Sequence, residues 1–398
     1  MTARSTVIGD RRQVARQRAA ARRRHPTQRE QVRPVGPPPV AFYVIAVVVA
    51  VFTMLGLLMV LSATSVREFH RGNSPWRVFG RQAGWAFFGI WAIWLAMRVP
   101  MHRWRRLLGP LTIASYALMV LPWLPGLGTS VNGARAWVSV GSMTFQPSEF
   151  LKLALLLQCA NLLAGRRGTT DVREVLGPVA WLGIVATGLC VVQNDLGSAI
   201  VVASIAFTVV FMAGAPLIPM AAAASVLGVA GSWFVLSTPY RRGRFTAFLD
   251  IAAHKDHLSY QTWQAMIAVA EGGLSGSGVG RGDTKLGEFL PLAHSDFIFA
   301  VVAEELGMLG VVAVIGGFFA LVFAAVQIAL AAHDRFHAMV AGGIAGWFAV
   351  QTTINIGGVV GLLPVTGLTL PFFSVGGSSL LVSMAAAGLL LNVARNVR

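Results

Sequence analysis

The feature that most constrains this chain is a series of long apolar runs separated by short polar segments. Only 12% of the residues are charged, against about 25% in an ordinary soluble domain. Ten of the runs come near the roughly 20 apolar residues that a helix needs to cross a bilayer. We place them at about 41–63, 80–98, 107–123, 148–165, 176–193, 196–215, 217–237, 297–328, 337–360 and 373–394. The sequence therefore predicts an all-α, polytopic membrane protein with about ten transmembrane helices.

Two places in this series leave alternatives open. The runs on either side of Gln193–Asp195 are separated by only a few polar residues, so they can also be read as one interrupted segment. The run at 297–328 is longer than a straight span requires. It is either kinked or continues out of the bilayer.

Residues 1–39 differ from the rest of the chain. They hold ten arginines, no lysine and two acidic residues, and so supply half of the formal net charge of +16. They end in the run PVGPPP, whose prolines exclude a helix and make a stiff spacer. We interpret them as a disordered cytoplasmic tail attracted to anionic lipid, with a partner-binding arm as the alternative. Nucleic acid is not expected as a partner, because the tail lacks a folded reading element.

Basic residues also predict the orientation, since cytoplasmic loops are enriched in Lys and Arg. With the tail inside, residues 40–398 form a membrane domain whose C-terminus is also cytoplasmic. The first outer loop, with Arg67, Arg71 and Arg77, goes against this rule. The long segment 238–295, between the seventh and eighth spans, is then a large extracytoplasmic loop. Loops of this length are usually functional or disordered, and its aromatic residues predict that it packs on the membrane surface.

Polar motifs lie near the predicted outer ends of several helices. In NGARAW, Arg135 can donate two hydrogen bonds to a phosphate or carboxylate, and Trp137 can anchor at the interface or stack on a sugar. In QPSEFLK, Glu149 and Lys152 share a helix face, where they either bind a ligand or form a structural ion pair. In QNDLGS, Asp195 is either functional or only the N-cap of the next helix.

A further polar group runs through the large loop. It includes Arg242 and Arg244 in YRRGR, the glycine-rich stretch 272–282, Lys285 and His294. The glycines can let backbone N–H groups approach an anion. They match neither the P-loop nor the dinucleotide-binding fingerprint, and a flexible turn is the simpler interpretation.

Asp296 follows Ser295 at the start of the eighth apolar run. A carboxylate near the membrane is costly and marks a functional site by default, with a helix cap as the alternative. A helix N-terminus favours the ionised form, so the sequence predicts a base available at neutral pH. Glu304 and Glu305 lie about 12–13 Å further along a straight helix, at ~1.5 Å per residue. That depth predicts that they hold the helix against its neighbours.

The collected groups are carboxylates, a lysine, arginines and an imidazole at one predicted face of the membrane. Such a set can bind an anionic diphosphate and transfer one proton. The sequence shows no nucleophile triad, HExxH metal site or haem motif. A transporter would instead place paired ionisable groups at the bilayer midplane, between inverted repeats.

With these motifs the sequence resembles the SEDS family (shape, elongation, division and sporulation), the FtsW/RodA/SpoVE peptidoglycan glycosyltransferases. NGARAW with QPSEFLKLAL, then QNDLGSA, LPLAHSDFIFAVVAEELGMLG and GLLPVTGLTLPFFSVGGSSLL occur in the family's order and spacing. The resemblance covers nearly the whole chain after the tail. It implies ten spans with a large outer loop between the seventh and eighth, and a cavity floor shaped by Pro364, Thr366 and Gly367. YRRGRFTAFLD favours the FtsW-like branch.

The resemblance implies an enzyme that polymerises lipid II at the outer face of the bacterial cytoplasmic membrane, with the family's essential acid at Asp296. The 4-hydroxyl of the acceptor sugar would attack the anomeric carbon of the donor chain, with Asp296 as the general base and undecaprenyl diphosphate as the leaving group. The displacement would be inverting. A diphosphate needs charge neutralisation more than it needs a proton. The candidates for neutralisation are Arg135, Lys152, Arg242, Arg244 and Lys285, or Mg²⁺ or Mn²⁺ held by Asp296, Asp195 or Glu149.

The resemblance also implies partners. These are a class B penicillin-binding protein acting as transpeptidase, other divisome or elongasome proteins, and membrane lipid. A lipid II flippase and a non-catalytic scaffold for the transpeptidase are the alternative functions. The sequence departs from the family pattern where Asn194 and Ile251 replace prolines, Leu292 replaces a glutamate and Ala136 replaces an arginine. These departures concern the substrate loops and leave the assignment of Asp296 unchanged.

Overall fold

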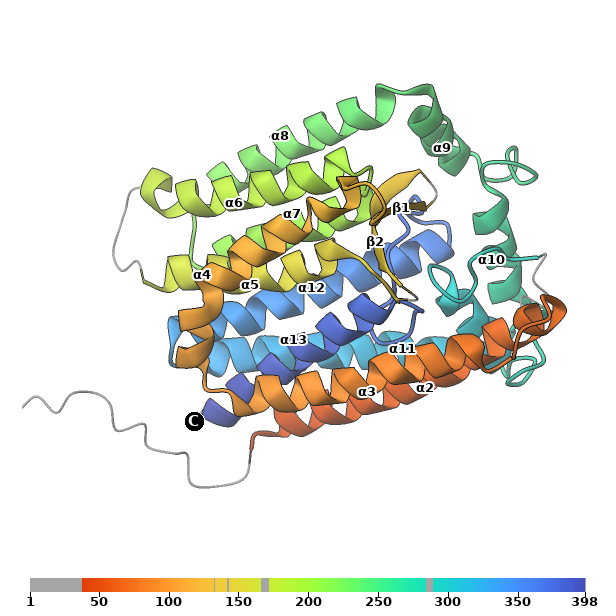
Figure 1. Cartoon of the computed structure of the whole chain (residues 1–398), viewed down its shortest axis with the longest axis horizontal. Helices are drawn as coiled ribbons and strands as arrows, with labels where there is room; N and C mark the ends of the chain where they lie inside the picture. The colour runs from red at the N-terminus through yellow and green to blue at the C-terminus, as the bar shows by residue number, and fades with distance from the viewer. Residues whose placement is uncertain (1–37, 132, 142, 166–171, 284–288, 398) are drawn as a thin grey trace, which may run out of the picture. The chain divides into compact units, whose positions relative to one another are not determined.

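The computed structural model describes residues 38–131, 133–141, 143–165, 172–283 and 289–397 (Figure 1). The arginine-rich tail, apart from Pro38 and Pro39, and the predicted site residue Lys285 lie outside the described residues. From Pro38 onward the chain forms one compact unit.

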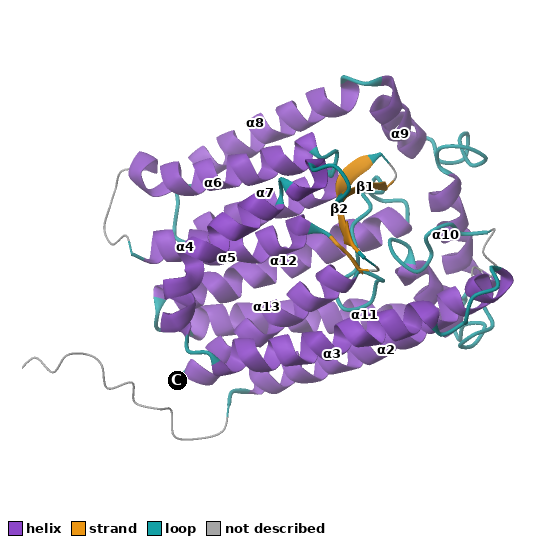
Figure 2. Cartoon of the chain, in the orientation of Figure 1, coloured by secondary structure: helices purple, strands orange, loops and turns teal. Residues whose placement is uncertain are grey.

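Helices make up most of this unit (Figure 2). They are α2 (Val40–His70), α3 (Arg77–Arg98), α4 (Met101–Leu118), the 3₁₀ helix η1 (Leu121–Trp123), α5 (Pro147–Ala164), α6 (Val172–Val192), α7 (Leu196–Met212), α8 (Leu217–Leu236), α9 (Pro239–Leu249), α10 (Tyr260–Glu271), α11 (Ile298–Ala331), α12 (Arg335–Val359) and α13 (Gly377–Asn396). Each of the ten expected spans overlaps one of α2 to α8 or α11 to α13. The mainly helical class is therefore confirmed.

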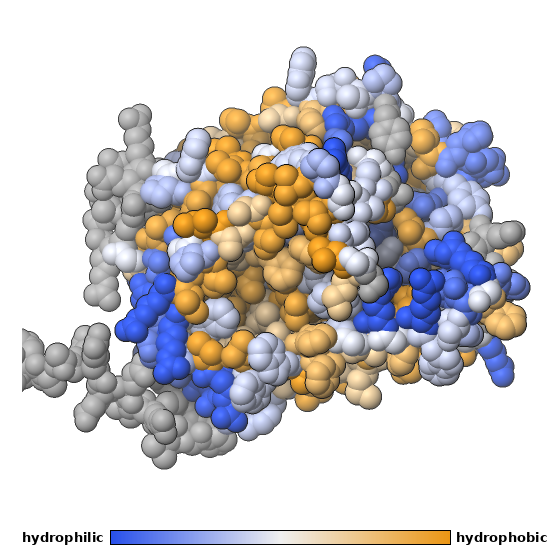
Figure 3. All heavy atoms as spheres, in the orientation of Figure 1, coloured by the Kyte–Doolittle hydropathy of each residue, from blue (hydrophilic) through white to orange (hydrophobic). Residues whose placement is uncertain are grey.

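The number of membrane spans stays a prediction. Within the described ranges, α2, α8, α11 and α13 are long and apolar enough to cross a membrane on their own. The pair α3 and α4 is apolar enough only when taken together and bends by 118°. Helices α5 and α12 contain buried polar side chains, which dilute their hydropathy. On the face shown in Figure 3, apolar side chains fill the middle and hydrophilic ones lie towards both ends, as expected of a multi-pass membrane protein.

A small antiparallel sheet follows η1 and was not anticipated. Its strands are β1 (Gly128–Val131), β2 (Ala134–Val140) and β3 (Met143–Phe145), in the order β1-β2-β3. Along β2, Ala136 and Val138 are buried while their neighbours are more exposed. This period of two is the sign of a half-buried strand, and seven residues are too few to register among the long apolar runs. The sheet is thus a small addition to the mainly helical fold that the sequence predicted.

The helices that carry the polar motifs pack on one another. Helix α11 contacts α2 and α12, α13 contacts α3, and α7 contacts α5, α6 and α12. Because α6 and α7 lie against each other, the chain reverses at Gln193–Asp195 instead of continuing as one interrupted span. Figure 1 shows the sheet, α9 and α10 at one end of the bundle and the C-terminus at the other.

Helix α11 is broken by Gly307, whose backbone is non-helical at φ 64° and ψ −159°. The glycine-rich stretch packs against this break. The backbone N–H of Ser277 donates to the Glu304 carbonyl at 2.9 Å, and that of Gly278 donates to the Glu305 carbonyl at 3.0 Å. These N–H groups therefore satisfy the carbonyls at a helix end, and the suggestion that they approach an anion is wrong for both.

Glu304 and Glu305 lie before the break, and their carboxylates have different partners. The Glu304 carboxylate accepts a hydrogen bond from the backbone N–H of Asp283, so it lies beside the large loop. The Glu305 carboxylate accepts one from the Ser62 hydroxyl on α2. Glu305 thus links two helices, as predicted, while Glu304 anchors the loop.

The packing of the glycine-rich stretch makes a testable prediction. Gly276 has φ 74°, and a Cβ there would collide with the Glu305 carbonyl. Gly276→Ala should lower the free energy of unfolding by about 2–4 kcal/mol, combining left-handed strain with overpacking. Gly280→Ala is the matched control, because its φ of 77° is nearly the same but its Cβ would meet open space. Denaturant unfolding in detergent micelles measures both variants, and equal losses would contradict the packing argument.

Candidate active site

Asp296 lies just before Phe297, the residue that caps α11. Its backbone carbonyl accepts a hydrogen bond from the Asn355 side chain of α12 at 2.9 Å, and the same amide donates to the Leu368 carbonyl at 2.7 Å. A Cβ added at Gly367 would lie 3.8 Å from Asp296 Oδ2, so the carboxylate lies beside a bare stretch of backbone. Asn355 thus holds the loop before α11 and the segment after α12 in fixed positions around the carboxylate.

The electrostatic surroundings of Asp296 favour a base near neutrality. Burial raises the pKa of Asp296 from 3.8 to about 6, while a hydrogen bond from Ser295 and the nearby Arg244 guanidinium act in the opposite direction. The helix N-terminus was expected to keep the acid strong, but desolvation outweighs it. At pH 7 the carboxylate is still mostly ionised, and it is a better proton acceptor than an ordinary aspartate.

A cavity of about 500 Å³ lies next to Asp296. It shares Val365 and Thr366 with the small hollow that Asp296 itself lines. The volume is within the usual range for a ligand site, and the lining is mainly apolar with a few polar groups, as such sites usually are. Arg241 and Arg244 bring positive charge to it. Pro364 and Thr366, which the resemblance implied as part of a cavity floor, also line it.

The helical phase of α9 decides which arginines of YRRGR reach this cavity. Arg241 and Arg244 are three residues apart, so they lie on one face, and both line it. Arg242 lines a separate hollow beside Ser237 and Pro239 instead. Sequence reasoning chose Arg242 and Arg244 and passed over Arg241. A helical-periodicity test of this loop would have favoured Arg241.

Arg241 is held by Asn194 at the turn between α6 and α7. Its Nη2 donates to Asn194 Oδ1 at 2.7 Å, and its guanidinium lies 3.7 Å from the centroid of the Phe234 ring. Asn194 has φ 61°, a conformation that Asn tolerates and that proline cannot adopt. The departure from the family's proline therefore comes with both a different turn and a hydrogen bond to a cavity arginine.

Arg135 and Trp137 lie on β2. The Arg135 backbone N–H donates to the Gln193 carbonyl at 3.0 Å, and its Nε donates to the Pro122 carbonyl at 2.9 Å. Trp137 pairs with Thr129 of β1 and is half-buried. Arg135 therefore ties the sheet to η1 and to the turn after α6, and neither residue lines the cavity beside Asp296.

Glu149 and Lys152 form an ion pair in the core. Lys152 Nζ lies 2.8 Å and 2.9 Å from the two Glu149 carboxylate oxygens and 3.1 Å from Gln351 Oε1. Glu149 is 2% exposed and Lys152 is 0% exposed. Of the two interpretations left open by the sequence, this geometry supports the structural ion pair.

Asp195 is the N-cap of α7, where its Oδ1 accepts from the Ser198 backbone N–H at 3.0 Å. Its Oδ2 accepts from Gln146 Nε2 at 2.6 Å, which ties α7 to the start of α5. Asp195 thus has the capping role, and both of its oxygens are engaged. His294 lines a second cavity, away from the one beside Asp296.

The three carboxylates proposed to hold a divalent cation do not converge. Glu149 is paired with Lys152, Asp195 caps a helix, and Asp296 lies beside Asn355. The searched part of the chain contains no group of three or more His, Cys, Asp or Glu that could hold a metal ion. Mg²⁺ and Mn²⁺ prefer several oxygen ligands, so these residues do not form a shared cation site.

Fold and site together define a multi-pass membrane protein with a carboxylate beside an arginine-containing cavity. The model of the FtsW/RodA/SpoVE cell cycle protein family matches residues 42–398, and the chain belongs to this family. The probable peptidoglycan glycosyltransferase FtsW of Mycobacterium tuberculosis is 36% identical over 363 residues, covering 91% of this chain and 69% of that protein. Stage V sporulation protein E of Bacillus subtilis is 37% identical over 358 residues, covering 89% of this chain and 97% of that protein. The resemblance seen in the sequence, including its FtsW-like branch, is confirmed.

Solved structures are similar to this chain as well. A chain of a peptidoglycan synthase complex, described as coordinating polymerization and crosslinking, is 30% identical and has a TM-score of 0.74. The similarity covers 89% of this chain and 98% of that chain. The rod shape determining protein RodA of Thermus thermophilus is also 30% identical, covers 89% and 96%, and has a TM-score of 0.66.

Proposed function

We propose that this protein is a peptidoglycan glycosyltransferase that polymerises lipid II at the outer face of the cytoplasmic membrane. One observation carries the proposal: a carboxylate with a pKa raised to about 6 lies beside a cavity lined by arginines. Family membership and the name of the Mycobacterium tuberculosis relative support the same activity.

The chain's own residues fit the two tasks of this reaction. Asp296 accepts the proton of the acceptor sugar's 4-hydroxyl as that oxygen attacks the anomeric carbon of the donor. The bond from that carbon to the diphosphate breaks, and the diphosphate leaves with the electron pair. Arg244 and Arg241 stabilise the negative charge that develops on the diphosphate, as fixed cationic donors do. Attack opposite the leaving group inverts the anomeric centre.

The proposal includes an orientation and a partner. Both chain termini lie in the cytoplasm, and Asp296 with the large loop faces outward, as the distribution of basic residues predicts. The partner is a class B penicillin-binding protein that cross-links the new glycan. The solved synthase complex, described as coordinating polymerization and crosslinking, supports such a partner.

A reconstituted assay tests the activity. The purified chain, with its cognate transpeptidase, is given labelled lipid II, and the products are separated by size. The wild type should form glycan polymer, and Asp296→Ala should form none. Arg103→Gln should form as much as the wild type, because Arg103 is exposed and lines none of the described cavities.

The alternatives give different results in the same assay. A lipid II flippase would move labelled lipid across vesicle membranes without making polymer. A non-catalytic scaffold would make no polymer but would still bind the transpeptidase. Either result, obtained with a folded wild-type chain, would overturn the proposed function.

A further inference from the structure

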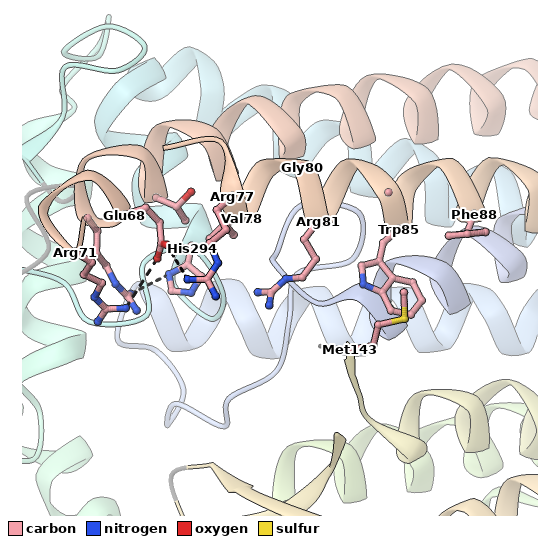
Figure 4. Close-up of a pocket in the computed structure, with 13 residues that line it drawn as sticks. Glu68, Arg71, Arg77, Val78, Gly80, Arg81, Trp85, Phe88, Met143 and His294 are labelled. Atoms are coloured by element: carbon pink, nitrogen blue, oxygen red, sulfur yellow. Dashed lines mark hydrogen bonds and ion pairs between the residues drawn. The ribbon is translucent and has the colours of Figure 1, made fainter. Parts of the chain in front are cut away.

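A second cavity, of about 580 Å³, lies between the outer ends of α2 and α3 (Figure 4). Four arginines line it together with one carboxylate, that of Glu68. The arginines are Arg67, Arg71, Arg77 and Arg81. His294 adds no charge near neutral pH, because burial and the surrounding arginines lower its pKa to about 4. The cavity therefore carries an excess of three positive charges.

Glu68 engages only part of this charge. Its carboxylate lies 4.0 Å from Arg71 Nη1 and 3.7 Å from Arg77 Nη1. Arg67 Nη1 is 3.5 Å from His294 Nδ1, which is a weak contact for a guanidinium. The Arg81 guanidinium makes no hydrogen bond or ion pair with any residue that the structure describes. Figure 4 shows Arg81 between His294 and Trp85.

Beyond Arg81 the lining of the cavity becomes mainly apolar and continues along α3. Gly80 and Gly84 leave open space above the helix, and Trp85 and Phe88 follow them. Phe88 is 51% exposed, and Trp91, on the same helical face, is 58% exposed. An anion at the arginines would thus have an apolar surface beside it, which is the arrangement that a lipid with an anionic headgroup requires.

Positive charge is unusual in the predicted first outer loop. Arg67, Arg71 and Arg77 fall in the predicted first outer loop, where the positive-inside rule disfavours arginine. Unpaired cations near a membrane are costly and mark functional sites. The chain connects the two cavities directly, since His294 lines this one and Asp296, two residues later, lines the hollow beside the first.

We propose that the cavity lined by Arg67, Arg71, Arg77 and Arg81 binds the diphosphate of a second polyprenyl-diphosphate-linked molecule, with its polyprenyl chain along Phe88 and Trp91. The inference rests on the proposed function. A polymerase of lipid-linked sugars joins two molecules that each carry a diphosphate, so it needs an anion-binding subsite for each of them. The short segment from His294 to Asp296 then lies between the two substrates.

Counting bound lipids tests the proposal without turnover. The full chain in neutral phosphatidylcholine nanodiscs is titrated with undecaprenyl diphosphate, and native mass spectrometry gives the number bound. The wild type should bind two molecules. Arg67→Gln/Arg81→Gln should weaken the second by about 10²-fold or more, because each charge-assisted hydrogen bond contributes substantially. Arg103→Gln/Arg106→Gln on α4 is the control of equal charge change and should bind two.

A variant that should bind the second molecule more tightly excludes misfolding as the cause of any loss of binding. Glu68→Gln removes the cavity's only carboxylate among the described lining residues. The affinity for the second molecule should therefore rise severalfold. Loss of the second molecule in the arginine variant, with tightening in Glu68→Gln, supports the proposal. Retention of two molecules by Arg67→Gln/Arg81→Gln, a wild type that binds only one, or equally tight binding of phosphatidylglycerol would overturn it. A chain that makes polymer but binds its second diphosphate elsewhere contradicts this inference and leaves the proposed function standing.

Discussion

Asp296→Asn should lower the rate of glycan polymerisation by about 10²–10⁴-fold, the usual contribution of a general base. The amide keeps the size of the carboxylate and the hydrogen bond from Asn355 to the backbone carbonyl, so the fold should survive. Initial rates on labelled lipid II, with thermal unfolding as the control for folding, measure the effect. A variant that keeps the full rate would contradict the role of Asp296 as base.

The pH dependence gives an independent test of the same role. Because burial raises the pKa of Asp296 to about 6, the carboxylate becomes protonated and can no longer act as a base as the pH falls through 6. The value of kcat/KM should then fall about tenfold per pH unit. Ser295 and Arg244 are the groups that oppose this rise in pKa. Arg244→Gln should therefore move the acid limb to higher pH, separately from its effect on binding. A wild-type limb near pH 4 would contradict the effect of burial.

Lys152→Ala should destabilise the protein by about 3–5 kcal/mol, because it leaves the buried Glu149 carboxylate without its cation. Lys152 also donates to Gln351, which itself accepts from the Trp347 indole at 2.7 Å. The loss therefore reaches the contact between α5 and α12. Denaturant unfolding in detergent micelles measures the free energy of unfolding.

The double variant Glu149→Gln/Lys152→Met separates structure from function. It removes both charges at once, and such replacements of a buried ion pair are often nearly neutral for stability. Most of the lost stability should return. Unchanged stability in Lys152→Ala would contradict the structural ion pair. A stable double variant that makes no polymer would show that the pair also serves the reaction.

The glycine-rich stretch and the first polar motif have partners inside the fold that the sequence did not reveal. The glycines of 272–282 left anion binding open beside the simpler flexible turn. Nothing in the sequence showed that carbonyls next to the Gly307 break accept hydrogen bonds from the N–H groups of Ser277 and Gly278. Likewise, Arg135 has the chemistry of a phosphate ligand, yet its Nε is bound to the Pro122 carbonyl. Competing partners inside the fold are invisible to a motif.

Hydrophobicity, charge and residue spacing in the sequence were sufficient to predict the helices and several local contacts. The apolar runs predicted the helices, and the position of Asp296 before one of them predicted its place at a helix start. The pairing of Glu149 with Lys152 followed from their spacing on one helix face. Each of these depends on contacts between residues close in the chain, whose geometry local structure fixes.

What the sequence determined alone was thus the helical membrane class and the family, and it singled out Asp296 as the candidate base. The tertiary structure decided which cations lie near that carboxylate and which are paired inside the core. Arg241 reaches the cavity because of the turn at Asn194 and the phase of α9, whereas Lys152 is buried between α5 and α12. The arginine-lined cavity between α2 and α3 is also lined by His294, which lies more than 200 positions further along the chain. Such contacts depend on how helices distant in sequence pack, and no local pattern encodes that.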